Sequence, residues 1–222
     1  MQSRSNTTPR PARGSLSREL ILQTALRIAD EAGLEALSMR RLGAELGVEA
    51  MSLYNHLPSK AALLDGMVEV ILDEMPTPGP GGSLTERIAE MAWAFRHALQ
   101  AHAGALPLFI TRPGVTKAAL RHVEAALGLL REAGFRADDS VSALNVLVTF
   151  VVGHTLSRWS RTPADELSKP LYEELAGDEF PNLNEAVTQL ATHDEDNEFA
   201  FGLDALLIGL RKMARPAREP AG

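Results

Sequence analysis

Apolar residues recur every three or four positions along most of the chain, which is the spacing of one face of an α-helix. The first such face consists of Ile21, Ala25, Ile28, Ala29 and Ala32. Ser17 is placed to cap this helix, Leu16 and Ile21 occupy the positions of a hydrophobic staple, and Gly33 follows its end. The pattern therefore predicts a helix over residues 18–32.

The same signals return directly afterwards. Ser38 is a second cap, and the pattern behind it predicts a short helix over about 39–46 that stops at Gly47. A further short helix fits residues 49–55. Two short helices joined by a turn that contains glycine, behind one longer helix, form the pattern of a helix-turn-helix unit.

The rest of the chain is also helical by its periodicity. Pro58 and Ser59 interrupt the pattern before a longer amphipathic helix over 60–74, and the run from Pro76 to Gly82 is the clearest loop. Residues 161–195 are polar and fit one or two weak helices. The other helical segments are predicted at 84–101 behind a Ser83–Glu86 capping box, within 107–113 as one turn, and at 116–132, 139–160 and 197–213.

No alternating strand pattern of useful length and no internal repeat are visible, so the fold class is all-α. We expect an N-terminal three-helix helix-turn-helix head over 16–75 and a larger helical ligand-binding and dimerisation body over 83–215. Residues 1–15, rich in Ser, Thr, Pro and Arg, are expected to form a disordered basic arm.

The segments 139–160 and 197–213 are apolar around nearly their whole circumference, which predicts burial on more than one side. Two copies of the chain could bury them in a four-helix bundle, with Gly153, Gly202 and Gly209 allowing close approach. They could equally be the central core helices of a monomer.

Composition excludes several kinds of chemistry. The chain has 222 residues and no cysteine, which rules out disulfides, thiolate zinc sites, iron–sulfur clusters and a cysteine nucleophile. Its apolar runs are shorter than the roughly 18 residues of a membrane-spanning helix, and the first 15 residues lack the apolar region of a signal peptide. We therefore expect a cytoplasmic protein without a membrane partner.

The net charge of −7 argues against nucleic acid as a partner until it is divided along the chain. Residues 1–60 carry a net charge of +2, and the remaining 162 residues carry −9. This asymmetry is typical of a protein that contacts nucleic acid at one end. It also fits a solvated arm that contacts nothing.

The predicted helix-turn-helix offers a set of outward groups that suit a DNA groove. Ala50, Met51, Ser52, Tyr54, Asn55 and His56 combine apolar contacts with hydrogen-bonding groups. Lys60 stands at the start of the next helix, where its ammonium group and the backbone N–H groups together can hold a phosphate. The alternative is an ordinary corner between two helices with exposed polar residues.

The stretch from Leu37 to Lys60, LSMRRLGAELGVEAMSLYNHLPSK, resembles the DNA-binding head of the tetracycline-repressor (TetR) family. The run from Gly47 to Lys60 matches the family's Gly-Val-x-x-x-[Ser/Thr]-Leu-Tyr-x-His-x-x-x-Lys signature. Looser matches continue into the body and resemble the tetracycline repressor's own C-terminal domain. They are Phe95-Arg96-x-Ala98-Leu99, Thr111-Arg112-Pro113, Gly134-Phe135 and Phe199-x-Phe201-Gly202-Leu203.

The resemblance implies a homodimeric transcriptional regulator that binds a palindromic double-stranded DNA operator. We expect it to act as a repressor and to be released from DNA by a small-molecule inducer. The DNA-binding residues that it implies are Ser38, Arg40, Ala50, Met51, Ser52, Tyr54, Asn55, His56 and Lys60. Ala50 and Met51 depart from the Gln and Pro of the tetracycline repressor, so the operator should differ as well.

The resemblance also places an inducer pocket in the body. The residues predicted to line it are Met67, Ile71, Met91, Phe95, Phe109, Thr111, Val148 and Val152. Leu108 stands where the tetracycline repressor has its magnesium histidine, and Pro76 and Met91 align with two further drug-binding positions. We therefore expect no metal and no cofactor, and an inducer other than a magnesium–tetracycline complex. The alternative is that these apolar residues form ordinary core.

Two other classes of function stay open at this stage. One is a helical small-molecule-binding protein or enzyme without DNA binding, although no nucleophile elbow, phosphate loop, dinucleotide motif or metal-ligand spacing is visible. We therefore expect no enzymatic activity. The other is a structural helical adaptor, which would dimerise without binding DNA.

Overall fold

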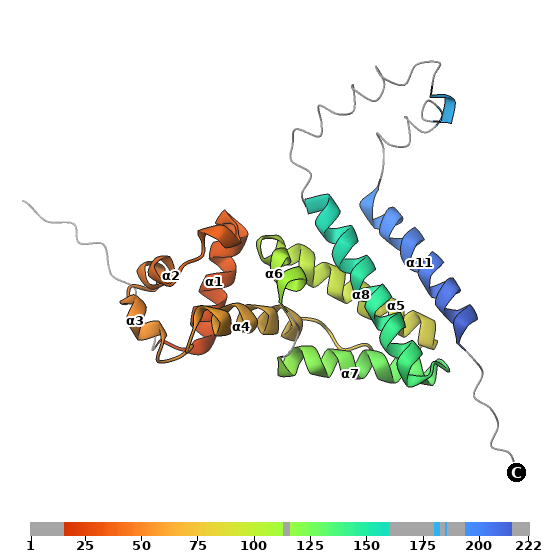
Figure 1. The fold of residues 1–222 in the computed structure, drawn as a ribbon, viewed down its shortest axis with the longest axis horizontal. Helices are drawn as coiled ribbons and strands as arrows, with labels where there is room; N and C mark the ends of the chain where they lie inside the picture. The colour runs from red at the N-terminus through yellow and green to blue at the C-terminus, as the bar shows by residue number, and fades with distance from the viewer. Residues whose placement is uncertain (1–15, 113–115, 160–179, 183–184, 186–193, 215–222) are drawn as a thin grey trace, which may run out of the picture.

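The computed structural model describes residues 16–112, 116–159, 180–182, 185 and 194–214, and within these ranges it contains helices and no strand. The predicted basic arm, most of residues 161–195 and the C-terminal tail lie outside them. Figure 1 shows two parts, a group of short helices around α1 and a larger group in which α5, α8 and α11 lie side by side. The helix α4 runs from one part toward the other.

The first part follows the predicted boundaries closely. It comprises α1 (Arg18–Ala32), the 3₁₀ turn η1 (Leu34–Ala36), α2 (Met39–Leu46), α3 (Ala50–Leu53) and α4 (Lys60–Asp73). Ser17, Ser38 and Ser59 cap α1, α2 and α4, because each hydroxyl accepts a backbone N–H from the first turn. These caps explain why the starts of three helices could be predicted from local sequence.

The second part is a helical layer built behind the loop at 76–82. It comprises α5 (Leu84–Ala101), the 3₁₀ turn η2 (Ala103–Ala105), α6 (Leu106–Thr111), α7 (Lys117–Glu132), α8 (Ala137–Trp159) and α11 (Glu195–Met213). The capping box at Ser83 and Glu86 is formed in both directions. Both carboxylate and hydroxyl therefore satisfy backbone donors that the helix itself leaves unpaired.

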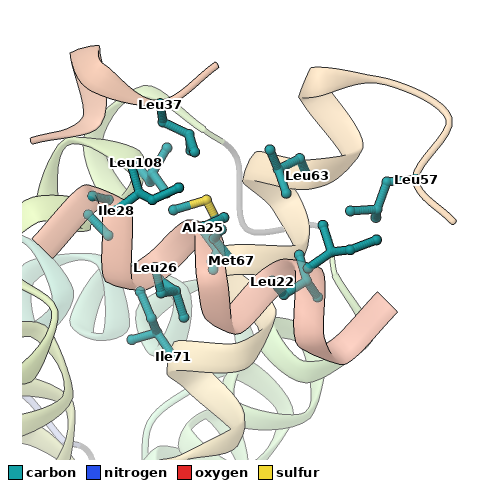
Figure 2. Packing of buried hydrophobic residues seen from close by; sticks show 14 of the residues in the cluster. Leu22, Ala25, Leu26, Ile28, Leu37, Leu57, Leu63, Met67, Ile71 and Leu108 are labelled. Carbon is teal, nitrogen blue, oxygen red and sulfur yellow. The ribbon is translucent and has the colours of Figure 1, made fainter. Parts of the chain in front are cut away.

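One hydrophobic cluster crosses from the first part into the second (Figure 2). Leu108 of α6 packs in the same cluster as Ile28 of α1 and Met67 of α4, and all three are nearly or completely buried. The head therefore does not have a core of its own that ends at α4. Any movement of α4 has to be accommodated by packing on the body as well, because close-packed interiors transmit displacement.

A buried arginine joins α5 to α11. Arg96 is 1% exposed, its Nη1 donates to Asp196 Oδ1 at 2.6 Å, and its guanidinium lies 5.2 and 4.8 Å from the ring centres of Trp93 and Phe199. Burial of an unpaired charge would be costly, and the ion pair and the two rings offset that cost. The helical periodicity predicts an apolar side chain at this core-facing position, so it did not indicate a buried arginine.

The helix α8 is less buried in one chain than its composition predicted. Val141 and Val146 are 49% and 44% exposed, and on α11 the side chain of Phe201 is 79% exposed. Gly202 packs inside the chain, where an added Cβ would touch the Phe150 ring, whereas Gly153 and Gly209 face open space. Within the residues that the structure describes, the two helices thus present apolar surface outward.

The segment Ala137–Ser157 of α8 has a mean hydropathy of 1.5, which by length and composition would suffice for a membrane span. Core helices of soluble proteins meet the same criterion. Here α8 packs against α5, α7 and α11, and its first turn carries Asp138 and Asp139. We therefore interpret its apolar character as packing surface.

Candidate DNA-binding surface and ligand cavity

The turn between α2 and α3 is built on two glycines. Gly47 adopts the left-handed conformation with φ of 67°, which a residue with a side chain rarely adopts. Gly43 lies inside α2 at the closest approach of the two helices, where an added Cβ would be 2.8 Å from the Val48 carbonyl oxygen. The turn pattern indicated Gly47 but not Gly43. A glycine inside so short a helix could have indicated that another part of the chain packs closely against it.

The outward face of this unit carries the residues predicted to contact DNA. Leu42 and Leu53 point inward and are fully buried, so the opposite sides of α2 and α3 face solvent. The residues exposed there are Arg40, Met51, Tyr54, Asn55, His56 and Lys60, with Ala50 and Ser52 partly exposed. Met51 is apolar and 72% exposed, so its side chain is accessible for an apolar contact with a partner.

Ser38 and Lys60 stand at the starts of α2 and α4. The Ser38 hydroxyl accepts the Arg41 N–H at 3.1 Å, so it has a structural role whether or not it contacts DNA. Lys60 is exposed at the first position of α4, beside backbone N–H groups that the helix does not use internally. This arrangement can bind a phosphate by charge and by direct hydrogen bonds.

The first half of α4 is fixed by two ion pairs. Asp65 accepts from Arg112 Nε at 2.6 Å, and Arg112 Nη2 also donates to the Ala61 carbonyl at 3.3 Å. One turn further on, Glu69 pairs with Arg18 of α1 at 2.7 Å. The helix that carries Lys60 is thus bonded to α1 on one side and to the end of α6 on the other.

The last turn of α4 is fixed from the body. Asp73 pairs with Arg121 at 2.8 Å, and the carbonyl oxygen of Leu72 accepts from His122 Nε2 at 2.7 Å. Both partners lie on α7. A helix end exposes carbonyl groups without internal partners, and cationic or donor groups stabilise it there.

His102, at the end of α5, bridges the two parts of the molecule. Its Nδ1 lies 2.9 Å from Asp30 Oδ2 of α1, and its Nε2 lies 2.9 Å from Glu74 Oε2 behind α4. Burial of the ring lowers the pKa of His102, and the hydrogen bonds to the carboxylates of Asp30 and Glu74 raise it. The increase exceeds the decrease, so the net pKa lies above the ordinary value of 6.5. The protonated ring can donate to both carboxylates at once.

A cavity of about 350 Å³ lies between α4, α5, α6, α7 and α8. Four of the predicted pocket residues line it, namely Met91, Phe95, Phe109 and Val148. Its other apolar lining residues are Val68, Leu72, Met75, Ile88, Ala92, Ala119, Val123, Ala126, Leu130, Leu144, Leu147 and Val151. A mostly apolar cavity of this size is typical of a site for a small organic molecule.

The structure places the other four predicted pocket residues elsewhere. Met67 and Ile71 are fully buried in the core shared by α1 and α4, and Val152 packs in a second core cluster. Thr111 is exposed, and its hydroxyl donates to the Pro107 carbonyl. These positions have the right helical spacing, but which side of a helix faces a cavity depends on the packing of its neighbours.

Three polar residues line the cavity, and the apolar pattern had not indicated any of them. They are Arg112, His122 and Asn145. Arg112 and His122 are also the residues that bond α4 at its two ends. Within the ranges that the structure describes, no group of three or more His, Asp or Glu side chains could hold a metal ion.

Comparison with known proteins places the chain among bacterial regulators. Residues 21–67 match "Bacterial regulatory proteins, tetR family", and residues 75–214 match "Tetracyclin repressor-like, C-terminal domain". The chain is 31% identical to the HTH-type transcriptional repressor DrrR1 of Streptomyces coeruleorubidus over 96% of this chain and 85% of that protein. It is 32% identical to the class C tetracycline repressor protein of Escherichia coli, over 89% and 92% of the two chains.

Solved structures agree with this placement. The Streptomyces coelicolor TetR family protein ActR in complex with actinorhodin superposes with a TM-score of 0.82 at 32% identity, covering 91% of this chain and all of that one. A TetR variant from Acinetobacter baumannii in complex with minocycline gives 0.76 at 28% identity, covering 94% of this chain and all of that one. Both similarities include the head and the body.

Proposed function

Because this chain belongs to the TetR family of ligand-responsive, DNA-binding transcriptional regulators, we propose that it is a repressor that leaves its operator when an apolar ring compound enters the cavity. Membership of this family makes it a regulator and not an enzyme, with operator DNA, a small-molecule inducer and a second copy of itself as partners. The observation that carries the proposal is α4, one helix that bears Lys60 on its first turn and lines the cavity with Val68 and Leu72.

On the DNA side, α3 enters the major groove. Met51 and Ala50 offer apolar contacts to thymine methyl groups, and Tyr54, Ser52 and Asn55 offer hydrogen bonds to base edges or phosphates. Arg40 reaches a guanine edge or the backbone from α2. The phosphate contacts come from His56 and Lys60, beside the α4 N-terminus.

The division of labour follows the two parts of the chain. Residues 16–75 form the DNA-binding domain and 83–215 the ligand-binding and dimerisation domain, with 1–15 as a basic arm. The exposed apolar faces of α8 and α11 support dimerisation through these helices, since a second copy would bury them in a four-helix bundle. A cytoplasmic location follows from the need to reach DNA.

The cavity favours a polycyclic, mostly apolar inducer without a metal ion. Relatives that cover the whole fold were solved with actinorhodin and with minocycline, which makes fused-ring compounds the first candidates. Leu108 is a buried core residue and offers no ligand to magnesium. Burial of ring surface against Phe95 and Phe109 would supply much of the affinity.

Release of DNA works through the spacing of the two heads. Two recognition helices of a dimer have to fit successive major grooves, which lie about 34 Å apart. An inducer that favours another position of α4 shifts the population of dimers toward a spacing that does not fit. The inducer can do so only by the difference in its affinity for the two arrangements.

The test uses the purified full-length protein and a pool of random DNA duplexes. Selection and sequencing should return a palindromic site, and a gel-shift assay with that site should show release by actinorhodin, used as the fused-ring probe. A protein that binds no DNA in the selection is not the proposed repressor. If the protein binds a palindrome but actinorhodin does not release it, the proposed DNA binding is supported and the proposed ligand class is wrong.

A further inference from the structure

Two residues that line the cavity also bond α4: Arg112 bonds its first half, and His122 bonds its last turn. His122 lies on α7 and lines the cavity, and its Nε2 is 2.7 Å from the carbonyl oxygen of Leu72 in the last turn of α4. Its neighbour Arg121 also bonds that turn, through Asp73, but does not line the cavity. His122 therefore both lines the ligand space and bonds the helix that carries Lys60.

The partner of Nε2 determines how the ring is protonated. A carbonyl oxygen can only accept a hydrogen bond, so Nε2 carries the proton and donates it. In the neutral ring, Nδ1 is then an acceptor. Nδ1 of His122 makes no hydrogen bond within the part of the chain that the structure describes.

The other polar groups of the cavity leave little competition for this role. Arg112 is engaged with Asp65 and with the Ala61 carbonyl, and it can only donate. Asn145, the third polar lining residue, lies on α8 and makes no hydrogen bond to α4 within the residues that the structure describes. Within an apolar cavity, a few polar groups fix the orientation of the ligand and provide its specificity.

We infer that His122 selects the inducer and couples it to α4, by accepting a hydrogen bond from a hydroxyl group of the ligand at Nδ1 while Nε2 holds the Leu72 carbonyl. This inference rests on the proposed function and specifies its ligand as an apolar ring compound that carries a hydroxyl donor. An analogue with a methyl group at that position leaves Nδ1 without a partner when the ligand displaces water.

The coupling follows from the length of α4. The helix has 14 residues and is about 21 Å long. When it rotates about its end at Leu72, Lys60 at the other end moves several times farther than the atoms next to Leu72. A ligand that pulls on the imidazole ring pulls on the carbonyl bonded to its other nitrogen. Val68 and Leu72 also line the cavity, so an occupant pushes on the same helix directly.

The test compares two probes, 2-hydroxyanthraquinone and 2-methylanthraquinone, on full-length protein. Calorimetry gives the Kd of each, and their ratio is the readout, because a merely structural defect would change both values alike. The variants are His122→Phe, which keeps a ring without nitrogen, and His122→Gln, whose amide can donate to Leu72 and accept from the ligand. The matched control is Arg121→Ala, which removes the neighbouring bond to the same turn.

We expect wild type and Arg121→Ala to bind the hydroxyl probe about 5- to 10-fold more tightly than the methyl probe. His122→Phe should bring this ratio close to one, and His122→Gln should restore part of it. In wild type the hydroxyl probe should weaken binding to the selected operator. This weakening should be smaller in His122→Phe and unchanged in Arg121→Ala.

An unchanged ratio in His122→Phe would overturn the inference, as would equal binding of both probes by wild type. Binding of neither probe by a wild-type protein that does bind its operator overturns the ligand class and leaves the repressor assignment in place. Loss of the ratio in Arg121→Ala as well would reduce His122 to a structural anchor. Failure of the proposed function itself is seen separately, as a wild-type protein that binds no DNA.

Discussion

Gly104 packs directly onto the backbone of Ala29, so closely that a methyl group at Gly104 would overlap the Ala29 carbonyl oxygen. The contact joins η2 of the body to the last turn of α1 in the head. It stands beside the bridge from His102 to Asp30. The two parts of the molecule therefore meet through a backbone contact and a polar bridge, as well as through a shared core.

We predict that Gly104→Ala destabilises the protein by about 1–3 kcal/mol, because backbone atoms have to move to admit the methyl group. The midpoint of urea unfolding measures this change. Gly128→Ala is the matched control: Gly128 lies on α7 with nothing within 4 Å of an added Cβ, and alanine there should stabilise by up to about 1 kcal/mol. Equal effects of the two substitutions would contradict the close contact.

His102 should make the stability of the protein depend on pH. Its folded-state pKa is raised above 6.5, so protonation stabilises the folded state fully below pH 6.5, and this contribution is lost as the pH rises through the raised pKa. We expect the difference in melting temperature between wild type and His102→Ala to be largest near about pH 6 and to shrink toward about pH 9.

The control for this experiment is His97→Ala, which removes an exposed histidine from the same helix. Its melting temperature relative to wild type should not follow the His102 profile. A pH-independent difference between wild type and His102→Ala would mean that the ring contributes by packing alone.

The exposed apolar face of α11 should be required for dimerisation. Phe201→Glu removes two large apolar side chains per dimer from the interface, which should raise the dimer dissociation constant roughly hundredfold or more. Light scattering across a dilution series measures it. Leu20→Glu introduces the same charge at an exposed apolar position of α1 and should leave the dimer intact; a monomer in both variants would point to general misfolding.

Lys60 should contribute to operator affinity through phosphate. The slope of log K against log salt is negative, and Lys60→Ala should make it less steep by about 2, since a dimer loses two phosphate contacts of about 0.9 each. Tyr54→Ala should weaken binding with a smaller change in slope, because its hydroxyl is uncharged. Fluorescence anisotropy at several salt concentrations gives both values, and Lys117→Ala, at the exposed start of α7, serves as the control. Equal slopes for Lys60→Ala and wild type would remove Lys60 from the interface.

Local signals were sufficient for most of the helix boundaries and for the exposure of the residues that we propose to contact DNA. Ser17, Ser38 and Ser59 cap helices because a hydroxyl can satisfy a nearby N–H wherever the chain next goes. Met51, Tyr54 and Lys60 lie on or beside a helix-turn-helix whose geometry is set within the 23 residues from Ser38 to Lys60. Their exposure follows from the burial of Leu42 and Leu53 on the opposite side.

The cavity required the tertiary structure. Helical spacing marks Met67 and Met91 alike as inward-facing, yet Met67 is core and Met91 lines the cavity, since α4 and α5 turn different sides toward the gap. Arg96 and His122 bond partners that are 100 and 50 residues away, a distance that no local pattern encodes.

The sequence by itself thus determined the all-α class, the helix-turn-helix and the residues that it exposes, because caps, turns and amphipathic faces depend on neighbours along the chain. Only the tertiary structure decided which apolar residues enclose a cavity, and that His122 joins this cavity to α4. These depend on how helices distant in sequence pack, and the free energy of that packing is shared among all of them.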